Sequence, residues 1–189
     1  NSRKEYIMER CGQWLDQYMG SGHGVDMGVS ECGNLAAADP NVVAVWYASQ
    51  LGTFADHGVE LFTPWEWHPG MWEVLHLFTS RCGPVRVRAH SSLDTVVSAY
   101  ASIRNDGSSM TVILVNRDRT SEKNAVLQLD GFSPSAAVCS TFTLRNLPSG
   151  SETFVSALKN ALIAGSAPVT EKSLSLDLPA LSVTAAVIN

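Results

Sequence analysis

The feature that most constrains this chain is that its first 83 residues predict only two short strands, each set between helices. Apolar spacing and flanking Pro and Gly residues predict helices over 3–20, 39–58 and 69–83, with strands over 25–30 and 59–63. Strands separated by helices of this length usually pair in parallel. Two parallel strands alone leave both faces and both edges of their sheet open. We therefore expect this part of the chain to be the end of a larger α/β barrel or open sheet.

After Pro84 the pattern changes to short β-branched or alternating runs separated by turns. Strands are expected over 85–90, 95–104, 109–116, 125–132, 137–145, 172–178 and 181–188. The Asn-Asp-Gly sequence at 105–107 is typical of a hairpin turn. This density of strands predicts an antiparallel β-sandwich. One segment, 153–165, has helical spacing and predicts a short helix or an irregular excursion. The expected fold class is thus α/β plus all-β, with residues 1–83 ending a (β/α)₈ barrel and 84–189 forming the sandwich.

Composition and charge exclude several classes of partner. Hydrophobic residues make up 45% of the 189 residues and charged residues 16%, which favours a packed core over disorder. The formal net charge is −5, and the basic residues are scattered apart from 81–88, whose alternation is typical of an exposed strand. Nucleic acid is therefore not an expected partner. No apolar run approaches the ~20 residues that span a bilayer, so no membrane partner is expected.

The spacing of cysteine and histidine indicates no metal or cofactor. The four cysteines are Cys11, Cys32, Cys82 and Cys139, and none forms a CxxC pair. They are expected to be buried free thiols or to form one fortuitous disulfide. The histidines show no HxH or HExxH spacing, and the Gly-rich stretch before the first strand is on the wrong side of it for a phosphate loop.

The ends of the two expected strands carry the candidate chemistry. In α/β barrels the carboxyl ends of the strands build the active site. Here the first strand ends at Glu31, and the second leads into Trp65, Trp67 and His68. A carboxylate can attack or stabilise an oxocarbenium-like centre, and indole rings can stack on the C–H face of a sugar. This combination favours a carbohydrate-cleaving site.

Each of these residues also has a structural alternative. A Glu at a strand end is often a solvated charge or an ion-pair partner. Trp65 and Trp67 could belong to a core or a domain interface, and alternation along an extended segment sends their side chains in opposite directions. One of the two is therefore expected to be structural, and Glu66 between them is expected to face solvent.

The motifs around these residues resemble glycoside hydrolase family 44. In that family a strand ending in Glu is followed by a helix with an "ALGIFGR-GV" type segment, and a final strand then ends in Trp. The matching segments here are MGVSECGN, AVWYASQLGTFADHGVELFTPWEW, MTVILVNRD and LDLPALSVTAAVI. The resemblance covers nearly the whole chain through short motifs. Related clan A families of xylosidases and arabinofuranosidases share the same layout.

The resemblance implies a (β/α)₈ barrel with a β-sandwich and retaining, endo-acting hydrolysis of β-1,4-linked glucans. Glu31 corresponds to the nucleophile at the end of the seventh barrel strand. Trp65 corresponds to the Trp that floors the subsite next to the scissile bond, and Trp67, His68 and Asn34 complete the expected substrate-binding set. The sequence departs from the family after Glu31, where it has Cys-Gly-Asn in place of the usual Tyr and Asn.

The resemblance also places the second catalytic carboxyl group outside this chain. In the clan, the acid/base ends the fourth barrel strand, whereas these residues supply only the last two strands. Retaining glycosidases need two carboxyl groups about 5–5.5 Å apart. The expected partners are a β-glucan polysaccharide or oligosaccharide and the N-terminal part of the barrel, from the same parent protein or a separate chain. The isolated chain is expected to be inactive, and the parent enzyme to be secreted.

Two alternatives stay open. The chain could belong to a related clan A xylanase, xylosidase or arabinofuranosidase. It could also be a non-catalytic carbohydrate-binding or scaffold protein derived from a glycosidase, because the neighbours of Glu31 are altered. Residues 84–189 contain no Trp and a single Tyr, Tyr100, so a sandwich that binds polysaccharide through a strip of aromatic rings is not expected.

Overall fold

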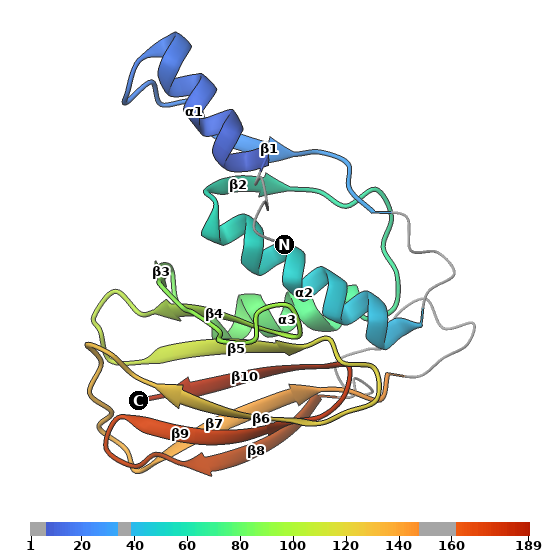
Figure 1. Cartoon of the computed structure of the whole chain (residues 1–189), viewed down its shortest axis with the longest axis vertical. Helices are drawn as coiled ribbons and strands as arrows, with labels where there is room; N and C mark the ends of the chain where they lie inside the picture. Colours follow the sequence, from blue (N-terminus) through green and yellow to red (C-terminus); the bar gives the residue numbers. More distant parts are fainter. Residues whose placement is uncertain (1–6, 34–38, 148–161) are drawn as a thin grey trace. The chain divides into compact units, whose positions relative to one another are not determined.

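A computed structural model of the chain describes residues 7–33, 39–147 and 162–189. The first elements alternate as predicted (Figure 1): α1 (Ile7–Met19), β1 (Met27–Val29), α2 (Pro40–Asp56), β2 (Val59–Phe62) and α3 (Met71–Arg81). The strands that follow are β3 (Val85–Val87), β4 (Val97–Ile103), β5 (Met110–Asn116), β6 (Lys123–Gln128), β7 (Val138–Leu144), β8 (Leu162–Pro168), β9 (Ser173–Leu178) and β10 (Ser182–Ile188).

The chain divides into two compact units, and one of the boundaries between them falls within α2, between Ser49 and Gln50. The α/β unit comprises 7–33 and 50–66 among the described residues, and the sandwich unit comprises 39–49, 67–147 and 162–189. The predicted domain boundary after residue 83 stays a prediction.

The α/β unit contains the parallel pair that the sequence predicts. β1 and β2 pair in parallel, with Val29 opposite Phe62. Gly28 lies so close to β2 that a Cβ there would be 3.2 Å from the Cβ of Leu61, which explains the glycine. These strands do not close a barrel within the described residues, so the complete barrel stays a proposal.

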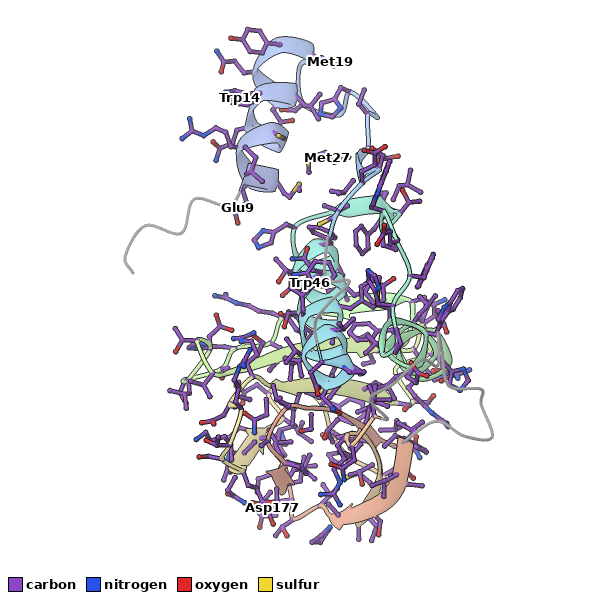
Figure 2. All side chains as sticks on the ribbon, turned by 90° about the vertical axis from the view of Figure 1, so that its right-hand side faces the viewer. Glu9, Trp14, Met19, Met27, Trp46 and Asp177 are labelled. Atoms are coloured by element: carbon purple, nitrogen blue, oxygen red, sulfur yellow. The ribbon has the colours of Figure 1, made fainter. Side chains whose placement is uncertain are left out.

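Helix α1 has no buried residue, although it is amphipathic. Its Trp14 and Met19 (Figure 2) are 47% and 56% exposed. An ion-pair contact joins it to the end of α2, where Nδ1 of His57 lies 3.1 Å from Oε1 of Glu9.

The sandwich unit contains the predicted antiparallel sheets. The larger sheet has the strand order β3-β4-β5-β10-β7-β8, and β6 pairs with β9 in a second, two-stranded sheet. All pairs within both sheets are antiparallel.

The central strand β5 is buried along its whole length, because both faces of its sheet are covered. On one face, Val112 and Leu114 pack in a core with Leu174 and Leu176 of β9. On the other face lie α3 and the first part of α2 (Figure 1), and the hydroxyl of Thr111 donates to the carbonyl of Arg81 at 2.6 Å. This two-sided burial explains why β5 is a continuous apolar run instead of an alternating one.

The predicted helix over 153–165 is wrong where the structure describes it. Residues 162–168 form the edge strand β8, which pairs with β7 from Leu144–Leu162 to Val138–Pro168. Residues 153–161 lie outside the described part. The free edge of β7 offers a row of unpaired backbone groups, and pairing with it overrides the local helical preference of 162–165.

A buried amide joins the two sheets at the end of β5. The side chain of Asn116 is fully buried, and its Nδ2 donates to the carbonyls of Leu178 and Pro179, both at 2.9 Å. The same amide nitrogen donates to the carbonyl of Ser121 at 3.1 Å, while its oxygen accepts the N–H of Asp118. Asn116 thereby fixes both the β5–β6 loop and the β9–β10 turn.

Asp118 organises the rest of this loop. Its carboxylate lies 2.7 Å from the ammonium of Lys123 and accepts the N–H groups of Thr120 and Ser121, both at 3.0 Å. The hydrogen bond from Lys123 and the two backbone N–H groups hold the pKa of Asp118 well below its ordinary value.

Asp118→Asn should therefore destabilise the protein at neutral pH. Because folding lowers this pKa, the charged group stabilises the fold above its unfolded pKa of about 3.9, and this stabilisation is lost as the pH falls further. The variant should unfold at lower urea concentration than wild type at pH 7, and the difference should shrink below pH 4. The measurement is urea unfolding followed by circular dichroism, carried out at pH 7 and at a pH below 4. Asp130→Asn, which removes an exposed carboxylate elsewhere on the sandwich unit, is the matched control and should leave the urea midpoint at pH 7 close to that of wild type.

Candidate active site

The carboxyl ends of β1 and β2 remain hydrogen-bonded to each other after the strands end. The N–H of Thr63 donates to the carbonyl of Val29 at 2.9 Å, and its hydroxyl donates to the carbonyl of Ser30 at 2.5 Å. Further along, the N–H of Trp65 donates to the carbonyl of Cys32 at 3.2 Å. The segment with Glu31 therefore runs alongside the segment with Trp65.

This extension is irregular at Glu31. The two backbone hydrogen bonds join Thr63 to Val29 and Trp65 to Cys32. Between them the segment after β1 advances by three residues, whereas the segment after β2 advances by two. One extra residue is thus accommodated on the side of Glu31, as in a β-bulge, which redirects side chains and is common beside active sites. Pro64 has no N–H to donate, so it fits opposite this irregular segment.

Glu31 and Trp65 are the two predicted site residues that the structure brings together. Glu31 is exposed, and Trp65 is 62% exposed. Both follow the carboxyl end of their strand, and the hydrogen bonds of their neighbours fix both backbones. An exposed carboxylate and an exposed indole are therefore presented at the same edge of a parallel strand pair.

Trp67 and His68 belong to the sandwich unit. The ring of Trp67 stacks on Trp72 at 4.2 Å between centroids and meets the buried Tyr47 edge-on at 5.9 Å. His68 is half-buried, and its N–H contacts the sulfur of Met71 at 3.3 Å. Asn34, the remaining predicted site residue, lies outside the described residues. Glu66 is exposed, as expected.

The aromatic partners of Trp67 are not among the residues that the sequence predicts for the site. Trp72 lies five residues further on, beyond the Pro69-Gly70 turn, and Tyr47 comes from α2. Burial raises the pKa of Tyr47 to about 12. The position of Trp72 is the signal that could have identified it, because it lies at the start of a helix, just after the Pro69-Gly70 turn.

No group of His, Cys, Asp and Glu suited to hold a metal ion occurs within 7–33, 39–147 and 162–189. The four cysteines are free thiols. Burial raises the pKa of the Cys82 and Cys139 thiols, so both are protonated at neutral pH and poorly suited as nucleophiles. Among the described helices, none has the length and apolar character needed to cross a bilayer.

Comparison with known proteins shows the fold. No protein-family model matches the sequence, and no curated protein matches it. Among solved structures, a bifunctional glucanase-xylanase from a metagenome library matches 96% of the chain with a TM-score of 0.76 and 22% identity. A family 44 endoglucanase from Clostridium thermocellum matches 97% of the chain with a TM-score of 0.74 and 20% identity. A family 44 xyloglucanase from Paenibacillus polymyxa matches 97% of the chain with a TM-score of 0.74 and 16% identity.

The chain spans only about a third of the length of these structures, 34–35% in each case. The resemblance to glycoside hydrolase family 44 is thus confirmed as a likeness in fold to one part of those enzymes. Their activities remain, for this chain, a matter of proposal.

Thr63→Val should loosen the junction between the two strand ends. The change keeps the shape of the side chain but removes the hydroxyl that donates to Ser30, which should cost about 0.5–1 kcal/mol. We expect faster hydrogen exchange at the amides of Thr63 and Trp65, measured by NMR. Thr63→Ser retains the hydroxyl and should preserve protection. Equal exchange in both variants would show that the side-chain bond does not hold the junction.

Proposed function

We propose that this chain is part of a retaining glycoside hydrolase that cleaves β-1,4-linked glucan-type polysaccharide. The observation that carries the proposal is the placement of Glu31 and Trp65 beside each other at the carboxyl ends of two paired parallel strands. The fold likeness supports it, because the matched structures are described as a glucanase-xylanase, an endoglucanase and a xyloglucanase.

In this proposal Glu31 is the nucleophile. Its ionised carboxylate attacks the anomeric carbon, the glycosidic C–O bond breaks, and a covalent glycosyl-enzyme forms. The departing oxygen takes a proton from an acid/base carboxyl group on another part of the barrel. Water then attacks the anomeric carbon, gives its proton to the same group, and releases Glu31. This chain supplies one of the two carboxyl groups that the reaction requires.

Trp65 is proposed as the aromatic wall beside the bond that is cleaved. Its exposed indole can stack on the apolar face of a pyranose, which buries a large area at a small cost in side-chain entropy. The hydrogen bond from its N–H to Cys32 fixes its backbone relative to the segment that carries Glu31. Trp67, His68 and Asn34 are proposed as further substrate contacts, and the polysaccharide substrate implies a secreted enzyme.

A specific observation favours one second candidate, a non-catalytic protein that has kept this scaffold. Cys32 and Gly33 follow Glu31 where the family tends to have Tyr and Asn, and Gly33 has a φ of 107°. Such a backbone conformation suits glycine and excludes most side chains. Covalent trapping separates this candidate from the enzyme, because a scaffold would form no glycosyl adduct.

Glu31→Gln in the protein that contains the complete barrel should abolish hydrolysis. Loss of a covalent nucleophile should lower kcat by roughly 10⁴-fold or more. The measurement is release of reducing sugar from β-glucan, combined with mass spectrometry after reaction with a 2-fluoro-cellobioside, which should label the peptide that contains Glu31. Glu66→Gln removes another exposed carboxylate of the same loop region and should retain activity. Loss of activity in Glu66→Gln alone would contradict the assignment.

The 189-residue chain by itself should not hydrolyse β-glucan or aryl cellobiosides. A single carboxyl group cannot both attack the sugar and protonate the leaving oxygen in one step. The same reducing-sugar assay on the purified chain measures this. Turnover by the isolated chain that disappears in Glu31→Gln would show that the second carboxyl group lies within these residues.

A further inference from the structure

A polar pocket lies between the end of α3 and the turn that joins β4 to β5. Its volume is about 680 Å³, which falls in the range of ~300–1,000 Å³ that is usual for small-molecule sites. It is lined by residues 80–84 after and at the end of α3, by Arg104 and Asp106 of the turn, and by Thr111 and Val187 of the sheet. All of these residues belong to the sandwich unit, so the pocket lies within one compact unit.

Arg81 brings a guanidinium group to this pocket that is not fully satisfied. Its guanidinium carbon lies 3.8 Å from the centroid of the Phe142 ring, so the ring covers one face of the planar group. Its Nε is buried and has no hydrogen-bond partner within the described residues, and none of their ion pairs involves Arg81. Buried donors are normally satisfied. An oxyanion in the pocket would supply an acceptor for this guanidinium group.

The turn adds a second guanidinium group, that of Arg104. Its Nε lies 4.0 Å from Oδ1 of Asp106, and both side chains are largely exposed, so this ion pair is weak. The carboxylate of Asp106 is held more closely by Ser108, whose N–H and hydroxyl donate to Oδ1 at 3.0 and 2.7 Å. Asn189 also lines the pocket, and its main-chain oxygen accepts the N–H groups of residues 135 and 136. The charged side chains of the lining are thus two guanidinium groups and one carboxylate, which favours an anionic ligand.

The two segments that carry these arginines are fixed against each other. The N–H of Gly83 donates to the hydroxyl of Ser102 at 2.9 Å, and a Cβ on Gly83 would lie 2.4 Å from the carbonyl oxygen of Ile103. The chain after α3 therefore lies directly on the end of β4. The turn is closed by the N–H of Arg104, which donates to the carbonyl of Ser109 at 3.0 Å. A pocket between two fixed segments is pre-organised, which lowers the entropy cost of binding.

We propose that this pocket binds a small molecule that carries a phosphate group, with Arg81 and Arg104 as the residues that contact the phosphate. A guanidinium group suits this role, because its planar N–H groups can bind two phosphate oxygens at once. A phosphate also has more acceptor oxygens than a carboxylate, which matches donors that come from two segments. The inference does not depend on the proposed function, because it uses only residues of the sandwich unit.

Isothermal titration calorimetry of the 189-residue chain with inorganic phosphate, glycerol 3-phosphate and glycerol tests this inference. Both phosphates should bind, and glycerol should not. Arg104→Gln should raise Kd for both phosphates about tenfold or more, because it removes charge-assisted hydrogen bonds. Arg81→Lys keeps the charge but removes the planar N–H groups, and it should also weaken binding. Arg119→Gln removes an exposed arginine from the loop after β5 and is the matched control, expected to leave Kd unchanged.

The outcomes separate the possible ligands from a failure of the inference. Tighter binding of glycerol 3-phosphate than of inorganic phosphate would support a phosphate ester as the ligand, and equal Kd values would support the free ion. Absence of binding of either phosphate at millimolar concentration would overturn the inference, as would equal Kd values for wild type and Arg104→Gln. An equal loss of affinity in Arg119→Gln would also overturn it, because binding would then follow overall charge. If Arg81→Lys lowers the melting temperature, Arg104→Gln decides, since its side chain is exposed.

Discussion

The sandwich unit depends on a sheet whose central strand must be covered on both faces. β5 has no exposed residue, and its two neighbours β4 and β10 pair with it along its full length. One face is covered by β9 with β6, and the other requires helices. Three contacts fix the end of α3 there. The hydroxyl of Thr111 donates to the carbonyl of Arg81, the last residue of the helix, and the guanidinium carbon of Arg81 lies 3.8 Å from the centroid of the Phe142 ring. Gly83, just after the helix, packs against the backbone of Ile103. Helix α3 is thereby an essential cover of the sandwich.

The same dependence extends to α2. The hydroxyl of Tyr100 donates to the carbonyl of Ser49, and the guanidinium of Arg117 contacts the hydroxyls of Ser49 and Ser98. These contacts hold the first part of α2 on the sandwich unit, while its last turns belong to the α/β unit. In the chain, α2 is also the connection between β1 and β2.

Much of this arrangement could be predicted from the sequence, because it follows from local patterns. Helical spacing and the Pro and Gly residues predicted α1, α2 and α3, and their order predicted the parallel pairing of β1 and β2. The strand ends predicted where Glu31 and Trp65 would lie. Features that depend on distant contacts were missed. The strand β8 exists because β7 offers an open edge, and Trp72 joins Trp67 and Tyr47 only through the turn at Gly70. The hydrogen bond from Thr63 to Ser30 likewise leaves no local signal.

Two features of the α/β unit fit the proposal that it is part of a larger barrel. Physically, α1 buries none of its residues, and the parallel pair of β1 and β2 pairs with no third strand among the described residues. Chemically, the proposed retaining mechanism needs two carboxyl groups, of which Glu31 would be one. Further parallel strands beside β1 and β2 would bury the exposed apolar surface and would also bring their own carboxyl ends to the edge where Glu31 and Trp65 lie. The exposed surface of the α/β unit and the proposed chemistry therefore both fit the proposal that the activity belongs to a complete barrel.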